Sequence, residues 1–295
     1  MAGGDSEKVV WAALLANSGI AVVKAIAAVL TRSGAMLAET IHSVADAGNQ
    51  ALLLLGARRA RRPPDRRHPF GYGAERYFWA FVVALVLFTL GSLFSLYEGV
   101  HKLRHPTTIT NVGWAYGVLG VAIVLETLSY RVAAQEVRRV RGKRRFWEYF
   151  FSSKDPSLPL VYLEDIGALL GLVLALAGVA AAHLLGWTLA DGLATVSVGI
   201  LLGAIAAVLL VRCHKLLIGE GGTPEDEQAI REAAAGVTGV AAVVDLKTLQ
   251  VGPRYLVVGL EVRFAVEDEE PVVRAIEHAI RQKVPYAKYI AVEPV

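Results

Sequence analysis

The sequence predicts an α-helical polytopic membrane protein with six transmembrane helices and a small C-terminal α/β domain. Hydrophobic residues make up 55% of the 295 residues and the mean hydropathy is +0.47, which is too apolar for an ordinary soluble protein. Several apolar segments approach the roughly 20 residues that a helix needs to cross a bilayer. From about residue 215 onward, charged residues return and the apolar residues follow the short patterns of a soluble α/β fold.

Hydropathy divides the chain into an N-terminal tail (1–7), a six-helix membrane domain (8–214) and a C-terminal domain (215–295). The predicted spans cover residues 8–30, 34–58, 77–100, 112–134, 159–185 and 187–213.

Basic residues predict how these spans are oriented. The Arg-rich runs 58–67 and 138–145 follow the second and fourth spans, whereas the connections 31–33 and 185–187 are very short. An excess of Lys and Arg marks the cytoplasmic side, so we expect both termini in the cytoplasm, although the basic connection 101–111 weakens the contrast. We expect the basic runs to set topology or contact the lipid bilayer, and not to bind nucleic acid. Abundant Ala and Arg favour a prokaryotic cell (inner) membrane, with a eukaryotic organelle as the alternative.

The C-terminal domain is predicted to have the order αββαβ, a ferredoxin-like arrangement with helices on one face of a small sheet. Acidic residues placed well for a helix dipole open the first helix at Thr223 or Pro224, and Gly236 ends it. The remaining predicted elements are strands 240–246 and 255–264, a helix at about 269–284 and a strand at 287–293.

A polar track crosses the predicted second span. Glu39, His42, Asp46 and Gln50 share one stripe of that helix. Ionisable side chains at membrane depth are costly and usually functional, and an imidazole and a carboxylate four residues apart can bind one divalent cation together. With a single cysteine, Cys213, the chain has neither an intramolecular disulfide nor a cysteine-rich metal cluster.

The chain resembles the cation diffusion facilitator family, whose members are divalent-metal/proton antiporters. It is most similar to the branch of the mitochondrial zinc transporters and their bacterial relatives. The resemblance covers nearly the whole chain and rests on Ser33-Gly34, the run 38–46 (AETIHSVAD), Asn49-Gln50, the run 68–73 (HPFGYG) with Glu75, the run 163–171 (LEDIGALLG), Asp191-Gly192 and the αββαβ tail.

The resemblance implies one intramembrane metal site with ligands from the second and fifth spans. His42 and Asp46 match the second-span pair, and Asp165 matches one fifth-span ligand. The other fifth-span position, usually His or Asp in zinc members, is Val161. Either three ligands and water hold the metal, or Glu164 or Glu39 replaces the missing ligand; both glutamates could equally be structural or relay protons. We expect Zn²⁺ first as the transported substrate, with Mn²⁺, Fe²⁺ or Co²⁺ as alternatives for an oxygen-rich site.

A second metal site of the family falls in the basic loop, where this chain has Asp65, His68 and Tyr72. Because Tyr72 replaces an imidazole and arginines crowd the loop, we expect Asp65 and His68 to form at most a weak site. The C-terminal domain retains only His278, so we expect it to dimerise without much metal of its own.

Three further polar residues, Asn17, Asn49 and Gln50, are expected to form interhelical hydrogen bonds. Gly167 and Gly171 are expected to permit close packing that brings Asp165 toward the second span.

We therefore predict a homodimer that exchanges metal for protons. His42 would couple the two, because an imidazole exchanges a proton near neutral pH. No organic cofactor is expected. An enzyme is disfavoured because the chain has neither His-Glu-x-x-His nor Gly-x-Gly-Asp. The alternative function is a non-transporting membrane scaffold that signals through the C-terminal domain.

Overall fold

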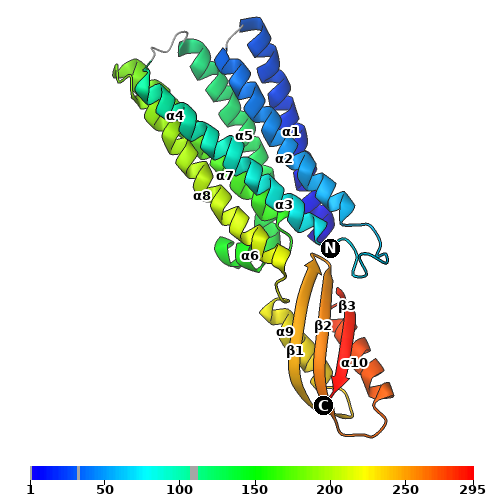
Figure 1. Ribbon diagram of the computed structural model, residues 1–295. Coiled ribbons are helices and arrows are strands. Elements are labelled where there is room, and N and C mark those ends of the chain that lie inside the picture. Colours follow the sequence, from blue (N-terminus) through cyan, green and yellow to red (C-terminus); the bar gives the residue numbers. More distant parts are fainter. Residues whose placement is uncertain (1, 32–33, 107–111) are drawn as a thin grey trace.

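The computed structural model describes residues 2–31, 34–106 and 112–295, and at positions 2–6, 24, 27–28, 30–31, 34–42 and 114 it describes the backbone alone. Long helices run side by side in a bundle, and the C-terminal α/β module extends from one end of it (Figure 1). The bundle comprises α1 (Ala2–Thr31), α2 (Gly34–Arg59), α3 (Glu75–Val86) with its continuation η1 (Leu87–Leu93) and α4 (Phe94–Arg104), α5 (Val112–Arg141), α7 (Ser157–Leu184) and α8 (Ala190–Ile218).

Four of these helices are long and apolar enough to cross a membrane within the part of the chain that the structure describes. They cover Glu75–Arg104, Ala115–Arg141, Ser157–Leu184 and Ala190–Ile218, and correspond to the third to sixth predicted spans. The first and second predicted spans form α1 and α2, and six crossings remain a prediction.

The third long helix contains a π-helical segment that the sequence did not predict. Thr89 Oγ1 donates to the Leu85 carbonyl 2.9 Å away, and Ser92 Oγ donates to the Gly199 carbonyl of α8 at 2.8 Å. Hydroxyl groups that bond to helix carbonyls compete with the regular ladder. We infer that these two bonds, together with close packing on α8, favour the wider turn.

A short helix, α6 (Phe146–Ser152), interrupts the connection between α5 and α7. No element was predicted for this stretch. Gly142, with φ of 59°, follows the last residue of α5, and extended residues flank α6 at Arg145 and Ser153. The helix is seven residues long, too short for a clear periodic signal in the sequence.

The glycines of α7 pack against α8, so one packing prediction was wrong. A Cβ at Gly167 would lie 2.8 Å from Ile205 Cδ1, and one at Gly171 would lie 3.5 Å from Val198 Cγ1. These small residues therefore permit the predicted close packing, but against α8 and not against α2.

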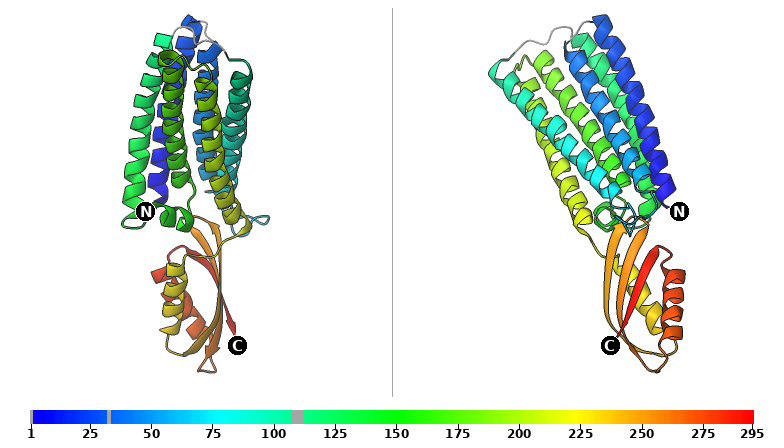
Figure 2. Two further views of the ribbon diagram at one scale, coloured as in Figure 1. Left: turned by 90° about the vertical axis from the view of Figure 1, so that its left-hand side faces the viewer. Right: turned by 45° about the vertical axis from the view of Figure 1, so that its right-hand side comes forward.

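The C-terminal module has the predicted order αββαβ. It comprises α9 (Pro224–Ala235), β1 (Val240–Gly252), β2 (Tyr255–Phe264), α10 (Glu270–Lys283) and β3 (Ala287–Pro294). The sheet order is β1-β2-β3, antiparallel between β1 and β2 and parallel between β2 and β3, with both helices on one face (Figure 2). Thr223 caps α9 by accepting a hydrogen bond from Asp226 N. β1 runs six residues past its predicted end, because Thr248 and Gln250 continue the ladder opposite Val258 and Leu256.

Buried charges link the end of α8 to the start of the module. Arg212 is 3% exposed and donates to Glu220 and to the Ser153 carbonyl, while Lys154 Nζ lies 2.9 Å from Glu220 Oε2. Burial alone would raise the pKa of Glu220, but the Lys154 hydrogen bond and Arg212 hold it below its usual value.

The loop between α2 and α3 contacts the tip of the β1–β2 hairpin. A Cβ on Gly73 would lie 2.8 Å from the Val251 carbonyl oxygen and 2.9 Å from Gly252 Cα, so the two backbones touch. The Phe70 ring meets Tyr289 edge-on, with centroids 5.5 Å apart. This glycine contact requires both residues to lack a side chain.

Candidate metal centre

Helix α7 carries two neighbouring carboxyl groups in the interior of the bundle. Glu164 is 6% exposed and Asp165 is 2% exposed. Adjacent residues point about 100° apart around a helix, so the two side chains reach different neighbours.

Glu164 connects α7 to α2. Its Oε1 accepts a hydrogen bond from Asn49 Nδ2 at 2.6 Å, and its Oε2 accepts one from Gln50 Nε2 at 3.1 Å. The oxygen of Gln50 in turn accepts from Asn17 Nδ2 of α1 at 3.2 Å. These bonds confirm the predicted interhelical role of the three amides. They also bring Asn49 and Gln50 of α2 to the Glu164 carboxylate of α7.

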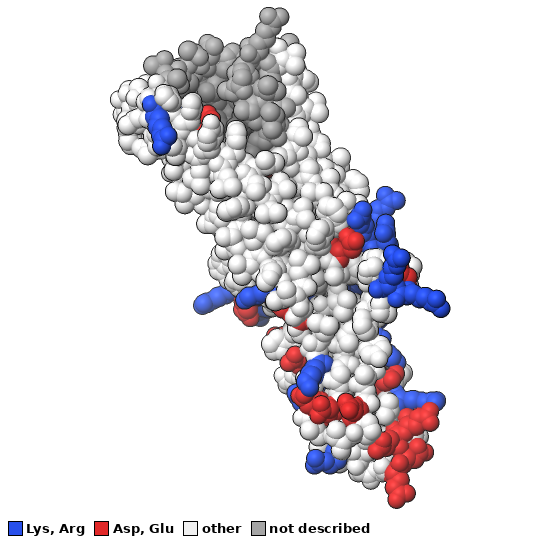
Figure 3. Space-filling view, in the orientation of Figure 1, with Lys and Arg blue, Asp and Glu red and all other residues white. Residues whose placement is uncertain are grey.

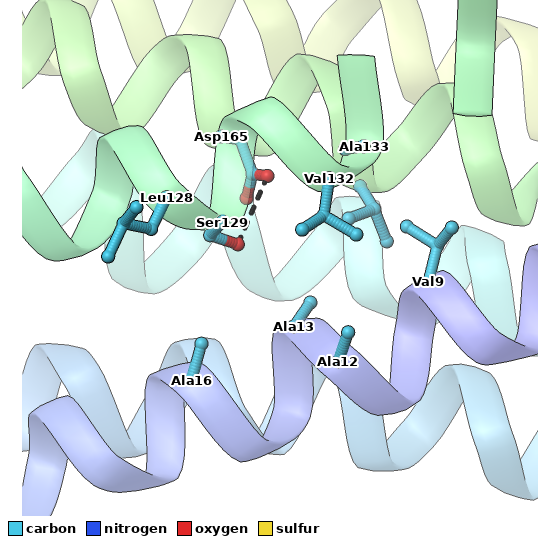
Figure 4. Close-up of a pocket in the computed structure, with 10 residues that line it drawn as sticks. Val9, Ala12, Ala13, Ala16, Leu128, Ser129, Val132, Ala133 and Asp165 are labelled. Atoms are coloured by element: carbon cyan, nitrogen blue, oxygen red, sulfur yellow. Dashed lines mark hydrogen bonds between the residues drawn. The ribbon is translucent and has the colours of Figure 1, made fainter. Parts of the chain in front are cut away.

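Asp165 faces α5 and a small cavity. Its Oδ2 accepts a hydrogen bond from Ser129 Oγ, 3.3 Å away on α5. Asp165 and Ser129 line a cavity of about 140 Å³ between α1, α5 and α7 (Figure 4). Val161, which is fully buried and lies one turn before Asp165, also lines this cavity. The other lining residues are small or apolar: Val9, Ala12, Ala13, Ala16, Leu128, Val132 and Ala133. The cavity is thus apolar except beside the Asp165 carboxyl group.

A further buried carboxyl group, Glu126 of α5, was not among the predicted site residues. It is 9% exposed and lies one turn before Ser129, on the same face of α5. Glu126 and Asp46 of α2 both act electrostatically on Glu164 and on Asp165. A glutamate in the middle of a predicted span was the available signal, because such a residue is a functional candidate by default.

The residues whose side chains the structure describes do not by themselves form a complete ligand set. Among the described residues, no group of three or more His, Cys, Asp or Glu side chains lies close enough to hold one ion. The predicted ligands His42 and Glu39 belong to α2, and their side chains lie outside the described positions. Asp46, Glu164 and Asp165 are brought to the same region of the bundle, and their role as ligands stays a prediction.

The predicted second site is a turn held by its own hydrogen bonds. Asp65 accepts from the backbone N–H groups of Arg67 and His68 at 2.8 and 2.7 Å and from the Tyr72 hydroxyl at 2.6 Å. The Tyr72 hydrogen bond and the His68 backbone N–H lower the pKa of Asp65 below its usual value. His68 Nδ1 lies 3.5 Å from Asp65 Oδ1. Asp65 and His68 therefore do meet, but the carboxylate already stabilises the loop.

Buried carboxyl groups in a bundle of apolar helices, followed by an αββαβ module, define a polytopic membrane protein with a candidate cation site. Comparison with known families gives the narrower assignment. The profile described as "Cation efflux transmembrane domain" matches residues 10–218, and that described as "Cation efflux protein, cytoplasmic domain" matches residues 223–295. The chain belongs to the cation efflux, or cation diffusion facilitator, family, whose members are transporters and not enzymes.

Its relatives place it in the mitochondrial-type branch. The chain is 37% identical over 248 residues to the "Proton-coupled zinc antiporter SLC30A9, mitochondrial" of Xenopus laevis, and 33% identical over 223 residues to "Metal tolerance protein C4" of Arabidopsis thaliana. These matches cover 83% and 75% of this chain but 44% and 49% of the relatives, so the chain spans less than half of their length. "Magnetosome protein MamB" of Paramagnetospirillum magneticum is 23% identical over 290 residues, which is 96% of this chain and 92% of the relative.

Proposed function

We propose that the protein is a divalent-cation/proton antiporter that exports metal from the cytoplasm, with zinc as its first substrate. The observation that carries this proposal is the convergence of α2, α5 and α7 on two adjacent buried carboxyl groups. Four carboxyl side chains, Asp46, Glu126, Glu164 and Asp165, interact electrostatically inside an apolar bundle. Such a group is expensive in a membrane unless it binds a cation or protons. Relatives that carry the name of proton-coupled zinc antiporters support the same conclusion.

The roles of the residues follow from their places on the helices. His42 and Asp46, one turn apart on α2, would bind the metal together with Asp165 of α7. Metal ligands must be deprotonated, so metal release and proton uptake at these side chains are linked. His42 is the coupling residue, since an imidazole exchanges a proton near neutral pH. Ser129 would orient the Asp165 carboxylate through the bond that it donates.

The orientation and assembly follow from charge and from the module. The Arg-rich segments after α2 and α5 lie at the module end of the bundle, so we assign that end to the cytoplasm. The module matches a domain of cation efflux proteins and would hold two protomers together.

The test is metal uptake into proteoliposomes with an imposed pH gradient, for zinc, manganese, iron and cobalt. Wild type should show gradient-dependent flux that Asp165→Ala abolishes. Asp245→Ala removes an exposed carboxylate of the module and serves as the matched control. If a correctly folded dimer moves no metal, the proposal fails and the scaffold function takes its place.

Metal identity is tested at Val161, where zinc members of the family carry a ligand. Val161→His adds an imidazole one turn from Asp165 and beside the 140 Å³ cavity, which has room for the longer side chain. Imidazole suits zinc better than manganese, so the ratio of zinc to manganese flux should rise several-fold. Val161→Leu fills space without adding a ligand and should leave the ratio unchanged. Equal loss of both fluxes in the two variants would show that position 161 does not face the metal.

A further inference from the structure

The short helix α6 presents an unusual outer face. Its inner face is formed by Phe146, Tyr149 and Phe150, of which the last two are buried in the core of the bundle. Its outer face carries Trp147 and Phe151, which are 52% and 51% exposed. A helix at the surface of a soluble domain normally turns polar residues outward, whereas α6 is aromatic on both faces.

The two exposed rings form one continuous apolar patch. Trp147 and Phe151 lie one helical turn apart and stack with centroids 6.2 Å apart and an interplanar angle of 27°. On the inner side, the Phe146 ring packs on Tyr162 of α7 at 4.9 Å, which fixes the helix against the bundle. The patch is therefore held outward by packing on its opposite side.

Basic side chains directly precede this patch. Lys143, Arg144 and Arg145 are all exposed, and Arg144 is held beside the helix because its side chain donates to the Arg141 carbonyl and to Ser152 Oγ. They continue the basic run that begins at Arg138 near the end of α5. Positive charge and exposed aromatic rings thus occupy adjoining positions.

This combination lies at the end of the bundle nearest the module (Figures 1 and 2). On the face shown in Figure 3, Lys and Arg gather at that same level, and the helices beyond it present few charges until the far end. Trp side chains at the boundary between apolar helices and water prefer the headgroup region of a bilayer. Nearby Lys and Arg attract anionic lipids.

We propose that α6, with Lys143 and Arg145 before it, is an interfacial anchor that binds the headgroups of anionic phospholipids in the leaflet facing the module. Trp147 and Phe151 insert at the boundary between headgroups and acyl chains, and the basic side chains bind the phosphate groups. The anchor fixes the start of α7, the helix that carries Glu164 and Asp165, relative to the membrane surface.

The first arm of the test measures where Trp147 lies. Trp147→Cys in a Cys213→Ala background is labelled with the polarity-sensitive dye NBD, and the whole protein is placed in nanodiscs of phosphatidylcholine with or without phosphatidylglycerol. The dye at position 147 should show blue-shifted emission and protection from an aqueous quencher, more so with phosphatidylglycerol. Arg263→Cys, labelled on the exposed surface of β2 at the end away from the bundle, is the matched control and should report water in both lipids.

The second arm measures headgroup preference. The double variant Lys143→Gln/Arg145→Gln should retain less phosphatidylglycerol, relative to phosphatidylcholine, than the wild-type protein does. The ratio of the two bound lipids should fall by about fivefold for each basic side chain that contacts the membrane surface. Arg263→Gln with Arg274→Gln removes the same charge from exposed positions of the module and should have no effect.

Three results would overturn the proposal. Water-like emission at position 147 would show that α6 does not enter the bilayer. If the dye at position 147 is protected from the aqueous quencher equally with and without phosphatidylglycerol, α6 does not recognise the anionic headgroup. Self-quenching between two labelled protomers would show that the aromatic patch is covered by a second copy of the chain.

Discussion

Replacing Glu164 separates its structural role from a role in binding metal. Glu164→Ala removes the acceptor of two buried hydrogen bonds, from Asn49 at 2.6 Å and from Gln50 at 3.1 Å. Hydrogen bonds between membrane helices contribute about 0.6 kcal/mol on average and up to about 1.7 kcal/mol. We therefore expect the two bonds together to contribute roughly 1–3 kcal/mol to the free energy of unfolding.

The measurement is a double-mutant cycle of unfolding in mixed detergent micelles without metal. Glu164→Ala, Asn49→Ala and the double variant should give a coupling energy of about 0.6–1.7 kcal/mol, the value for the one bond that the cycle isolates. Glu164→Ala with Ser129→Ala is the matched control. Ser129 is bonded to the neighbouring carboxylate, Asp165, and not to Glu164. The control coupling should stay below about 0.5 kcal/mol.

A coupling to Asn49 no larger than the coupling to Ser129 would refute this reasoning. The transport readout then completes the separation. If Glu164 joins α7 to α2, Glu164→Gln keeps an oxygen that accepts the shorter bond and should retain zinc flux in proteoliposomes. Loss of flux with unchanged stability would instead identify Glu164 as the replacement for the missing fifth-span ligand.

Three further predictions concern the junction between bundle and module. Arg212→Ala leaves Glu220 without its buried partner and should destabilise the protein by about 1–3 kcal/mol in thermal or chemical unfolding, a smaller cost than for a fully buried pair because Glu220 is partly exposed. The pKa of Glu220 is lower in the folded protein than in the unfolded chain, so the ionised carboxylate stabilises the fold fully at neutral pH. This stabilisation is lost as the pH falls below the unfolded-state pKa and then through the folded-state pKa. Glu220→Gln should therefore make stability depend less on pH in the acid range. Gly73→Ala places a methyl group 2.8 Å from a hairpin carbonyl, so it should part the loop from the hairpin and speed proteolysis there, whereas Gly117→Ala, with nothing within 4 Å, should not. An unchanged cleavage pattern in Gly73→Ala would show that this contact does not hold the module.

Much of the architecture could be predicted because hydropathy and periodicity act over long segments. The bounds of α7 and α10 lie within a few residues of their predicted ranges, and the αββαβ order is confirmed. The seven residues of α6 gave too short a pattern. The π-helical turn depends on bonds such as Ser92 to Gly199, between residues 107 positions apart. Such contacts become visible only once the helices are packed.

The candidate site was predictable by residue type but not by partner. His42 and Asp46 stood out because charge is rare in a span, whereas Glu164 and Asp165 were predicted from the family resemblance. Which neighbour each carboxyl group would face depends on how α7 is rotated in the bundle. Gly167 and Gly171 of α7 pack on α8. Sequence spacing alone could not show this, since small residues permit close packing on any neighbouring helix.

The different hydrogen-bond partners of Glu164 and Asp165 help to decide what could replace the metal ligand that is absent at Val161. Because the two side chains diverge, Glu164 to amides of α2 and Asp165 to Ser129 of α5, one ion can reach both only after the Glu164 bonds break. The cavity beside Asp165, by contrast, is walled by Val161 itself and holds about 140 Å³, room for several water molecules of about 30 Å³ each. A water needs two or more polar partners, and Asp165, Ser129 and a bound cation would supply them. We therefore propose a site in which water takes the place of the absent side chain, while Glu164 keeps α2 and α7 together around it.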